Sequence, residues 1–281
     1  MAITDFAFAV RAGEHACCRA VDRRDRERLA AGFVLAGLSR GYKVVYLCDP
    51  RDADPTLALL RAADARVEEA LQRGQFDVRD AAATYAPDGT FDVERMLEAV
   101  RTEHTRALAA GYAGLSMTGD VGAGLSGAPG AQQLAEYERR LDAQLGGTTD
   151  VLLCQYDHPT FDPETISEAA AAHHVDVSAQ LAAIGRTGVL AAARVHPPEM
   201  LRLAGELDFE CAEGVADAVG AEFRRPLQVD LADLSFIDVA GLRALRGGAT
   251  DGLTICAASQ PVRRLVELLA WDTDPAVRLS A

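Results

Sequence analysis

Histidine and cysteine residues give this sequence its clearest capacity for chemistry. His15 and Cys17 lie two residues apart near the N-terminus, and Cys154 and His173 lie in the middle of the chain. Thiolate and imidazole are suitable ligands for a metal ion or for haem iron. His-x-Cys is not a structural zinc pattern without a second close pair, however, and a cysteine in an apolar segment is commonly a buried free thiol. The four residues are therefore candidates for a metal site, with packing and helix-end roles as the default interpretation.

The residues needed for phosphate-transfer chemistry are missing near the N-terminus. A phosphate-binding loop has the sequence Gly-x-x-x-x-Gly-Lys-Ser/Thr, because its backbone amides bind phosphates and its lysine neutralises them. Between Phe8 and Arg28 the chain has one glycine, Gly13, and no lysine. ATP hydrolysis by the standard mechanism is therefore not expected, and no hydrolase site is predicted either. We expect a protein that is not an enzyme.

The charge balance of the chain limits its partners. Its 28 Lys and Arg residues stand against 42 Asp and Glu residues, which gives a formal net charge of −14 over 281 residues. This charge repels phosphate backbones, so direct binding to nucleic acid is not expected. No apolar run reaches the length of a membrane span, and residues 1–11 lack the features of a secretion signal. The sequence therefore predicts a cytoplasmic protein without a membrane partner.

The first 185 residues alternate between strand and helix patterns. The run Lys43–Cys48 is rich in Val, Tyr and Leu and ends at Asp49-Pro50, which is typical of a strand buried on both faces. Further strand patterns lie at Phe76–Arg79, Ala113–Thr118 and Asp150–Tyr156. Helix patterns cover Arg26–Arg40, Pro55–Arg73, Val93–Ala110, Gln132–Gln144 and Pro163–His173. We expect an α/β fold with a parallel sheet flanked by helices, and a loop in the Gly-rich segment Gly119–Gly130.

A ligand pocket is expected at the carboxyl ends of these strands, where open α/β sheets hold their ligands. We expect the apolar run Phe6–Val10 to form the first strand, so that the His15 segment follows it. Polar residues also follow or end the later strands, and the candidate pocket residues are His15, Cys17, Asp49, Thr118, Asp120, Tyr156 and Asp157. For each of them, packing or helix capping is the simpler alternative. The sequence names neither the ligand nor a cofactor.

Several short blocks in this region resemble the MEDS family, the methanogen/methylotroph DcmR sensory domain. The blocks are Gly13–Cys17, Phe33–Leu47, Gly111-Tyr112 with Thr118–Asp120, Tyr137-Glu138, Cys154–Asp157 and His173. Their order and spacing fit nearly the whole region. The resemblance implies a relative of RecA-type or circadian-clock-type ATPases with a degenerate phosphate loop. It also implies that the domain senses a small molecule, such as a hydrocarbon derivative.

Residues 200–281 repeat the alternation of strands and helices on a smaller scale. A connector at residues 186–199, which contains Pro197-Pro198, separates them from the first domain at residues 1–185. Three ordered blocks of the second domain resemble the STAS family of sulfate transporters and anti-sigma-factor antagonists. The blocks are Leu203–Asp208, Val229–Leu231 and Phe236–Leu242. The resemblance implies a small, non-enzymatic α/β domain that binds other proteins.

Candidate partner-binding residues lie in the first and last of these blocks. They are Asp208, Asp238, Val239, Ala240 and Gly241. Asp238 lies where an apolar segment changes to a helix pattern, which predicts an N-cap, and Gly241 permits another backbone to approach closely. The resemblance implies that a partner kinase contacts the domain at this turn. Capping and close packing explain both residues without any partner.

The STAS resemblance also implies a switch that this chain lacks. In the family, a Ser or Thr directly after the Asp at the position of Asp238 is phosphorylated by the partner kinase, and the added charge disrupts the interface. Val239 and Ala240 carry no hydroxyl at this place, and the nearest hydroxyls in the sequence belong to Ser235 and Thr250. Control is therefore expected to come from the N-terminal domain, or the partner binds constitutively.

Together these patterns predict a cytoplasmic signalling regulator. In this interpretation a domain that senses a small molecule controls how a STAS-like domain engages an anti-sigma factor or a related switch kinase. One alternative is a structural scaffold in a signalling complex, and another is a sensor that binds a metal ion or haem. A third alternative, a nucleotide-dependent enzyme with a STAS tail, is opposed by the missing phosphate loop. Self-association into a homo-oligomer is left open.

Overall fold

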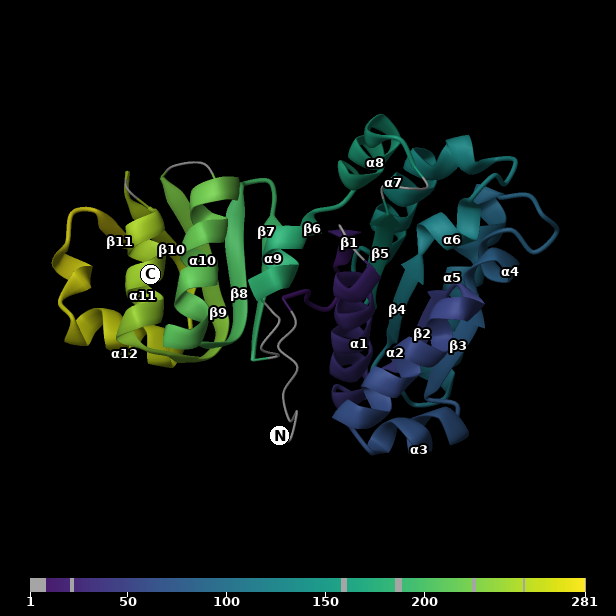
Figure 1. Ribbon diagram of the computed structural model, residues 1–281, viewed down its shortest axis with the longest axis horizontal. Coiled ribbons are helices and arrows are strands. Elements are labelled where there is room, and N and C mark those ends of the chain that lie inside the picture. The colour runs from purple at the N-terminus through teal and green to yellow at the C-terminus, as the bar shows by residue number, and fades with distance from the viewer. Residues whose placement is uncertain are drawn as a thin grey trace. The chain divides into compact units, whose positions relative to one another are not determined.

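The computed structural model describes residues 9–20, 23–157, 161–184, 189–223, 226–249 and 251–280 (Figure 1). The described chain divides into two compact units, here called the N-terminal unit (Val10–Asp176) and the C-terminal unit (Ala9 together with residues 177–280). The predicted connector at residues 186–199 contains a strand, β7 (Leu190–Val195), which belongs to the C-terminal unit. No helix among the described residues is long and apolar enough to cross a membrane.

A mainly parallel sheet forms the centre of the N-terminal unit. Its strands lie in the order β1 (His15–Ala20), β5 (Val151–Asp157), β4 (Leu115–Asp120), β2 (Lys43–Cys48) and β3 (Phe76–Asp80), and the boundary between the units falls within a further strand, β6 (Val175–Ser178). The pairs from β1 through β3 are all parallel. Every residue of β2 and of β4 is buried, as expected for central strands covered on both faces. The predicted α/β class with a parallel sheet is confirmed.

Helices cover both faces of this sheet. They are α1 (Arg23–Ser39), α2 (Pro50–Ala63), α3 (Arg66–Gln72), α4 (Ala81–Tyr85), α5 (Val93–Ala109), α6 (Val121–Leu125), a 3-10 turn (Ala131–Gln133), α7 (Leu134–Leu145) and α8 (Pro163–Ala170). Helix α1 packs on the face that carries Val44 and Ser116, whose side chains lie within 3.0 Å of the Cβ that an alanine at Gly37 would have. Helices α5 and α7 pack on the opposite face, with Val45, Met117 and Leu152.

Three local predictions for this unit were wrong. The segment predicted as one helix, Pro55–Arg73, is split, because Asp64 adopts an extended conformation between α2 and α3. The Gly-rich segment contains α6, which Asp120 caps by accepting from the amide of Ala123 at 2.9 Å. His15 does not follow a strand but begins β1, and most of the run Phe6–Val10 lies outside the described residues.

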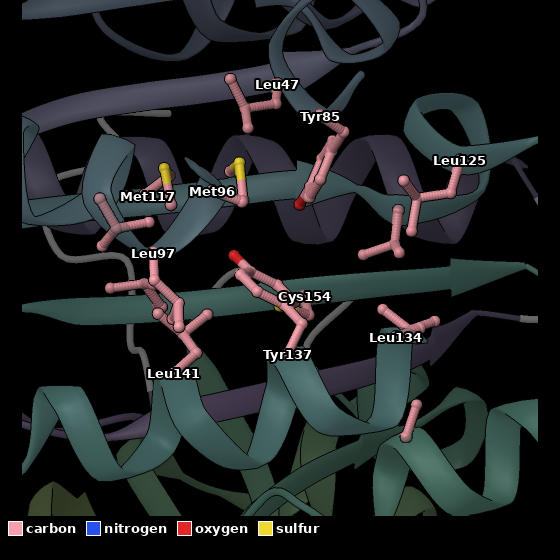
Figure 2. Close-up of a cluster of buried hydrophobic side chains, with 14 of the residues drawn as sticks. Leu47, Tyr85, Met96, Leu97, Met117, Leu125, Leu134, Tyr137, Leu141 and Cys154 are labelled. Carbon is pink, nitrogen blue, oxygen red and sulfur yellow. The ribbon is translucent and has the colours of Figure 1, made fainter. Parts of the chain in front are cut away.

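The apolar core of the N-terminal unit lies between the sheet and helices α5 and α7 (Figure 2). Leu134, Tyr137 and Leu141 project from α7 toward the strand that carries Cys154. Tyr85 fills the space opposite them, because Gly124 has no side chain to obstruct its ring: a Cβ on Gly124 would lie 2.2 Å from Tyr85 Cδ2. Glycine in the Gly-rich segment therefore serves core packing.

The C-terminal unit also consists of paired strands with helices packed on them. Its strands lie in the order β11 (Val277–Leu279), β10 (Leu253–Ala258), β9 (Leu227–Ile237), β8 (Met200–Leu207) and β7. The β7–β8 pair is antiparallel, and the β8–β9, β9–β10 and β10–β11 pairs are parallel. Its helices are α9 (Ala179–Ile184), α10 (Phe209–Glu222), α11 (Val239–Gly248), α12 (Gln260–Leu268) and a 3-10 turn (Trp271–Thr273). Arg202 and Asp230 form a buried ion pair at 3.3 Å on adjacent strands.

Candidate functional site

Four polar side chains meet inside the N-terminal unit, in what we call the buried cluster: His15, Glu138, Cys154 and His173. They come from β1, α7, β5 and the segment after α8. Each is at most 5% exposed, and Glu138 is 0% exposed. One nitrogen, oxygen or sulfur atom of each side chain lies within 4.8 Å of those of the other three. Side chains of these types are rarely buried together unless they are paired or bind a metal ion.

Strand register explains how β1 and β5 contribute to the buried cluster. The two strands are parallel, with His15 opposite Leu152 and Cys17 opposite Cys154. Side chains alternate between the faces of a sheet, so His15 and Cys154 lie on the same face, which α7 covers. Glu138 lies on the buried side of α7, between Leu134 and Leu141. The amide of His173 donates to the carbonyl of Ala170, which places this histidine in the turn that ends α8.

Glu138 is the centre of the cluster. Its Oε2 atom lies 3.3 Å from His15 Nε2, 3.5 Å from Cys154 Sγ and 3.6 Å from His173 Nε2. His15 Nε2 and Cys154 Sγ are 3.2 Å apart. The other carboxylate oxygen, Oε1, accepts a hydrogen bond of 2.5 Å from the hydroxyl of Tyr156.

Burial controls the protonation of these groups. Loss of water raises the pKa of Glu138 to about 7, although hydrogen bonds from Tyr156 and Cys154 act in the opposite direction. Burial, followed by the nearby charge of His173, lowers the pKa of His15 well below its ordinary value. Burial also raises the pKa of the Cys154 thiol. Burial therefore disfavours a charged imidazolium at His15 beside Glu138.

Two further groups hold the cluster residues in place. His173 Nδ1 lies 2.9 Å from the carbonyl oxygen of Ala169, which accepts from the protonated form of that nitrogen. This hydrogen bond leaves Nε2 of the neutral imidazole as the atom that faces Glu138. The hydroxyl of Tyr156 likewise donates to Glu138 Oε1, so Oε2 is the carboxylate oxygen that faces the other cluster residues.

A second polar region lies at the carboxyl ends of β2 and β4. It is a pocket of about 510 Å³ that is lined mainly by charged residues, including Arg23, Arg26, Asp49, Asp52 and Asp120. Arg26 bridges Asp52 and Asp120 at 3.1 Å each. The Arg51 side chain holds the pKa of Asp49 at about 2. These carboxylates are neutralised within the pocket, so its charges already have partners.

In the C-terminal unit, two aspartates cap neighbouring helices. Asp238 accepts from the amide of Gly241 at 2.7 Å, in the first turn of α11, and from the amide of Phe209 at 3.1 Å, in the first turn of α10. Asp208 accepts from the amides of Glu210 and Cys211 at 3.0 and 3.3 Å. We call this arrangement the double cap. The predicted N-cap role of Asp238 is present in the structure.

Two families match the chain, one over each unit. The model of the MEDS family, the methanogen/methylotroph, DcmR sensory domain, matches residues 14–174, which is more than half of the sequence. The chain belongs to the MEDS family. The STAS domain model matches residues 191–275. Hereafter the N-terminal unit is called the MEDS domain and the C-terminal unit the STAS domain.

Comparison with solved structures gives more distant likenesses. The flagellar accessory protein FlaH from Methanocaldococcus jannaschii is 10% identical, with a TM-score of 0.42, over 69% of this chain and 79% of that chain. A KaiC-like protein from Pyrococcus horikoshii OT3 is 10% identical, with a TM-score of 0.41, over the same shares of the two chains. A search of curated proteins found no match.

The MEDS domain brings together three of the four predicted metal candidates, His15, Cys154 and His173. Cys17 is separate, because its thiol faces Asp176 Oδ1 at 3.7 Å. Glu138 was named only as part of a family block, since a glutamate on a charged helix is usually at the surface. Its position on the apolar stripe of α7, four residues after Leu134, was the signal that marks it as buried.

The seven predicted pocket residues do not form one site. His15 belongs to the buried cluster and Tyr156 donates to its Glu138, whereas Asp49 and Asp120 line the charged pocket. Thr118 is buried on the opposite face from Cys154 and donates to the carbonyl of Leu153 at 2.9 Å. Cys17 faces Asp176, and the side chain of Asp157 lies outside the described residues.

Two enzyme motifs can be judged against the MEDS domain. β1 ends at Ala20 and α1 begins at Arg23, so two residues stand where a phosphate loop needs eight. The segment Gly37–Gly41 has the Gly-x-Ser-x-Gly pattern of a nucleophile elbow. It lies at the end of a helix rather than in a strand-to-helix turn, and Ser39 Oγ donates to the carbonyl of Ala36 at 2.9 Å. Ser39 therefore lacks the setting of a catalytic nucleophile.

The STAS domain places the predicted partner residues around the double cap. Gly241 is buried, and a Cβ there would lie 2.6 Å from the carbonyl oxygen of Leu207, so the backbone that approaches it is the end of β8. Val239 and Ala240 are half-buried at the start of α11. Ser235 is exposed and donates to the carbonyl of Gly205 at 3.0 Å, and Thr250 lies outside the described residues.

Proposed function

We propose that this chain is a signalling regulator, in which the state of the MEDS domain controls how the STAS domain binds an anti-sigma factor or a related switch kinase. The observation that carries the proposal is the pairing of a sensory-family domain with a STAS domain on one chain. Neither family match by itself includes both a domain that receives a signal, here called the input, and a domain that binds a partner protein, here called the output.

The input is assigned to the MEDS domain because its buried cluster contains groups that can gain or lose a proton or bind a ligand. Burial raises the pKa of Glu138 to about 7, so this side chain changes its protonation near neutral pH, and the carboxylate, the thiol and the imidazoles are all groups that can bind a metal ion. A purely structural core is normally built from apolar side chains, and a buried polar cluster is costly unless every member is satisfied. The cluster is therefore the part of the domain that a signal is best able to change.

The output is assigned to the surface beside the double cap. Phe209, in the first turn of α10, is 69% exposed, and Phe236, at the end of β9, is 47% exposed. Large exposed aromatic side chains are enriched where proteins bind one another. No hydroxyl is present at Val239 or Ala240, so a phosphate at these positions does not provide the switch. This supports control from the MEDS domain.

We further propose that the regulator is not an enzyme. The short connection between β1 and α1 supports this, because a phosphate loop uses a run of backbone amides and a lysine that the connection does not supply. A scaffold without any input remains the competing function, and the experiment below separates the two.

Site-specific cross-linking tests the output. A photoreactive amino acid is placed at Ala240 of the full chain in its source cells, and a matched variant carries it at Arg264, which is exposed on α12. The proposal predicts a cross-link to an anti-sigma factor or switch kinase from Ala240 and none from Arg264. Equal cross-links from both positions, or cross-links only to unrelated proteins, would contradict it.

The same partner then tests the input. Its affinity is measured for the wild-type chain and for His173→Gln, a change in the MEDS domain far in sequence from the double cap. The regulator predicts different affinities, whereas a scaffold predicts equal ones. An Asp162→Asn variant, which alters an exposed cap of α8 outside the buried cluster, serves as the control and is expected to bind like wild type.

A further inference from the structure

We infer that the buried cluster is a binding site for a tetrahedral divalent metal ion of the zinc class, with His15 Nε2, Glu138 Oε2, Cys154 Sγ and His173 Nε2 as its four ligands. The assignment depends on the geometry of the four side chains, and only its role as the input of the regulator rests on the proposed function.

The spacing of the ligand atoms agrees with a tetrahedron. Zinc binds nitrogen and oxygen at about 2.0–2.2 Å and sulfur at about 2.3 Å, which places tetrahedral nitrogen and oxygen ligands about 3.3–3.6 Å from one another and sulfur about 3.5–3.7 Å from them. Glu138 Oε2 lies 3.3, 3.5 and 3.6 Å from the other three ligand atoms, and His15 Nε2 lies 3.2 Å from Cys154 Sγ, which is somewhat shorter than a tetrahedral edge. The three distances from Glu138 therefore already match the edges of a zinc site, and all four atoms lie within 4.8 Å of one another. A hydrogen-bonded network alone does not require three separate side chains to converge on one carboxylate oxygen.

The chemistry of the ligands fits the same class of metal. Two imidazoles, one thiolate and one carboxylate are the donor types that bind zinc, whereas magnesium and calcium prefer oxygen ligands alone. The charges also balance, because one thiolate and one carboxylate neutralise a divalent cation. A neutral complex is the form in which these groups are least costly to bury, and each is at most 5% exposed.

Two of the four inferred ligands have the supporting hydrogen bond expected at a metal site. A metal-bound histidine usually donates its other ring nitrogen to a carbonyl or carboxylate, and ligating carboxylates are hydrogen-bonded in turn. His173 has this partner in the carbonyl of Ala169, and Glu138 has it in the hydroxyl of Tyr156. Both hydrogen bonds leave the inferred ligand atom directed at the centre of the cluster.

Binding has a defined proton balance. Zinc(II) displaces the proton of the Cys154 thiol, together with the proton of Glu138 in the fraction of molecules that carry one, and both protons leave to solvent. No electron is transferred. Since four protein ligands complete the tetrahedron, the site has no open position for a substrate, which is the pattern of a structural or regulatory metal site rather than a catalytic one.

The direct test uses the full chain and needs no partner protein. The chain is purified under reducing conditions, treated with a chelator, and titrated with zinc sulfate in competition with a chromogenic chelator. Cobalt(II) is then added to a second chelator-treated sample, because tetrahedral cobalt with a thiolate ligand absorbs in the visible and near-ultraviolet. We expect one zinc per chain and a cobalt spectrum with both tetrahedral and thiolate bands.

Variants assign the metal to the cluster. Cys154→Ser should abolish the thiolate band and lower zinc affinity by more than about 100-fold, a larger loss than removal of a supporting hydrogen bond causes. Cys48→Ser is the matched control, since Cys48 is buried in the same domain but lies at the end of β2 on the opposite face of the sheet, and it should bind like wild type. A folded wild-type chain that binds no zinc or cobalt would overturn the inference, as would a thiolate band that survives Cys154→Ser. These results do not depend on partner binding, so the metal site and the proposed function can fail separately.

Discussion

Glu138 in the MEDS domain and Asp238 in the STAS domain are carboxylates with opposite relations to their surroundings. Asp238 accepts from two backbone amides at helix N-termini, which stabilise its charge. Glu138 is fully buried among side chains from separate elements, and burial raises its pKa to about 7. A carboxylate that caps a helix is thus satisfied by local structure, whereas Glu138 needs either a proton or a cation. The difference separates a structural role from a ligand role.

The pH dependence of stability sharpens this comparison most strongly. In the metal-free chain the pKa of Glu138 rises from 4.5 to about 7 on folding, so the folded state binds more protons than the unfolded state between these values. The free energy of unfolding should therefore fall as pH rises from about 4.5 to about 7, by roughly 3 kcal/mol from this group, and then level off. Glu138→Gln should remove that part of the slope in urea denaturation followed by circular dichroism.

The control for this slope is Glu136→Gln on the same helix. Glu136 is on the surface and pairs with Arg139, so the variant should keep the wild-type dependence on pH. Equal slopes for wild type and Glu138→Gln would mean that Glu138 has an ordinary pKa and that burial does not oppose its ionisation.

Tyr156→Phe tests the support of the inferred metal ligand. The variant loses the hydrogen bond to Glu138 Oε1, which should lower zinc affinity by about 10- to 100-fold in a competition titration. Tyr137→Phe is the control, because the Tyr137 hydroxyl is buried beside Glu138 on α7 and has no hydrogen-bond partner among the described residues. Unchanged affinity in Tyr156→Phe, or the same loss in both variants, would exclude the supporting role.

Gly241→Ala tests close packing at the double cap. The new Cβ would lie 2.6 Å from the carbonyl oxygen of Leu207, so the variant should lose about 1–3 kcal/mol of stability. Gly247→Ala in the same helix meets nothing within 4 Å and should gain about 0.5–1 kcal/mol. Urea denaturation followed by the fluorescence of Trp271, the one tryptophan of the chain, reports on this domain. Changes of the same sign in both variants would contradict the packing account.

Asp238→Ala should have the smallest effect of the series. Two amides lose an acceptor at accessible helix ends, which costs about 1 kcal/mol in the same fluorescence assay. Glu267→Ala removes an equal charge from the exposed side of α12 and should change stability by less than about 0.5 kcal/mol. If Asp238→Ala increased stability, the aspartate would be held under strain for a partner rather than for capping.

The double cap was predictable from sequence because it is local. Asp238 and Gly241 are three residues apart, and a change from apolar strand to helix pattern marks the cap. The central strand Lys43–Cys48 was likewise predicted with its observed bounds, since a continuous run of β-branched and aromatic residues is a strong signal.

The buried cluster was only partly predictable because strand register and helix packing assemble it. His15 and Cys154 are 139 residues apart, and nothing in the intervening sequence states that β1 lies beside β5. The expectation that His15 follows a strand failed because the strand begins at His15 itself, where alternation over six residues is a weak signal. The buried position of Glu138 was hard to recognise from the sequence, because α7 contains several other charged residues.

The central claim is that the carboxylate of Glu138, unlike that of Asp238, is a ligand. X-ray absorption at the zinc edge of the zinc-loaded full chain tests it most directly, because it counts the atoms around the metal. The account predicts one sulfur at about 2.3 Å and three nitrogen or oxygen atoms at about 2.0–2.2 Å, with one of the three lost in Glu138→Gln. A shell without sulfur, a shell with two sulfurs, or a shell unchanged by Glu138→Gln would contradict it.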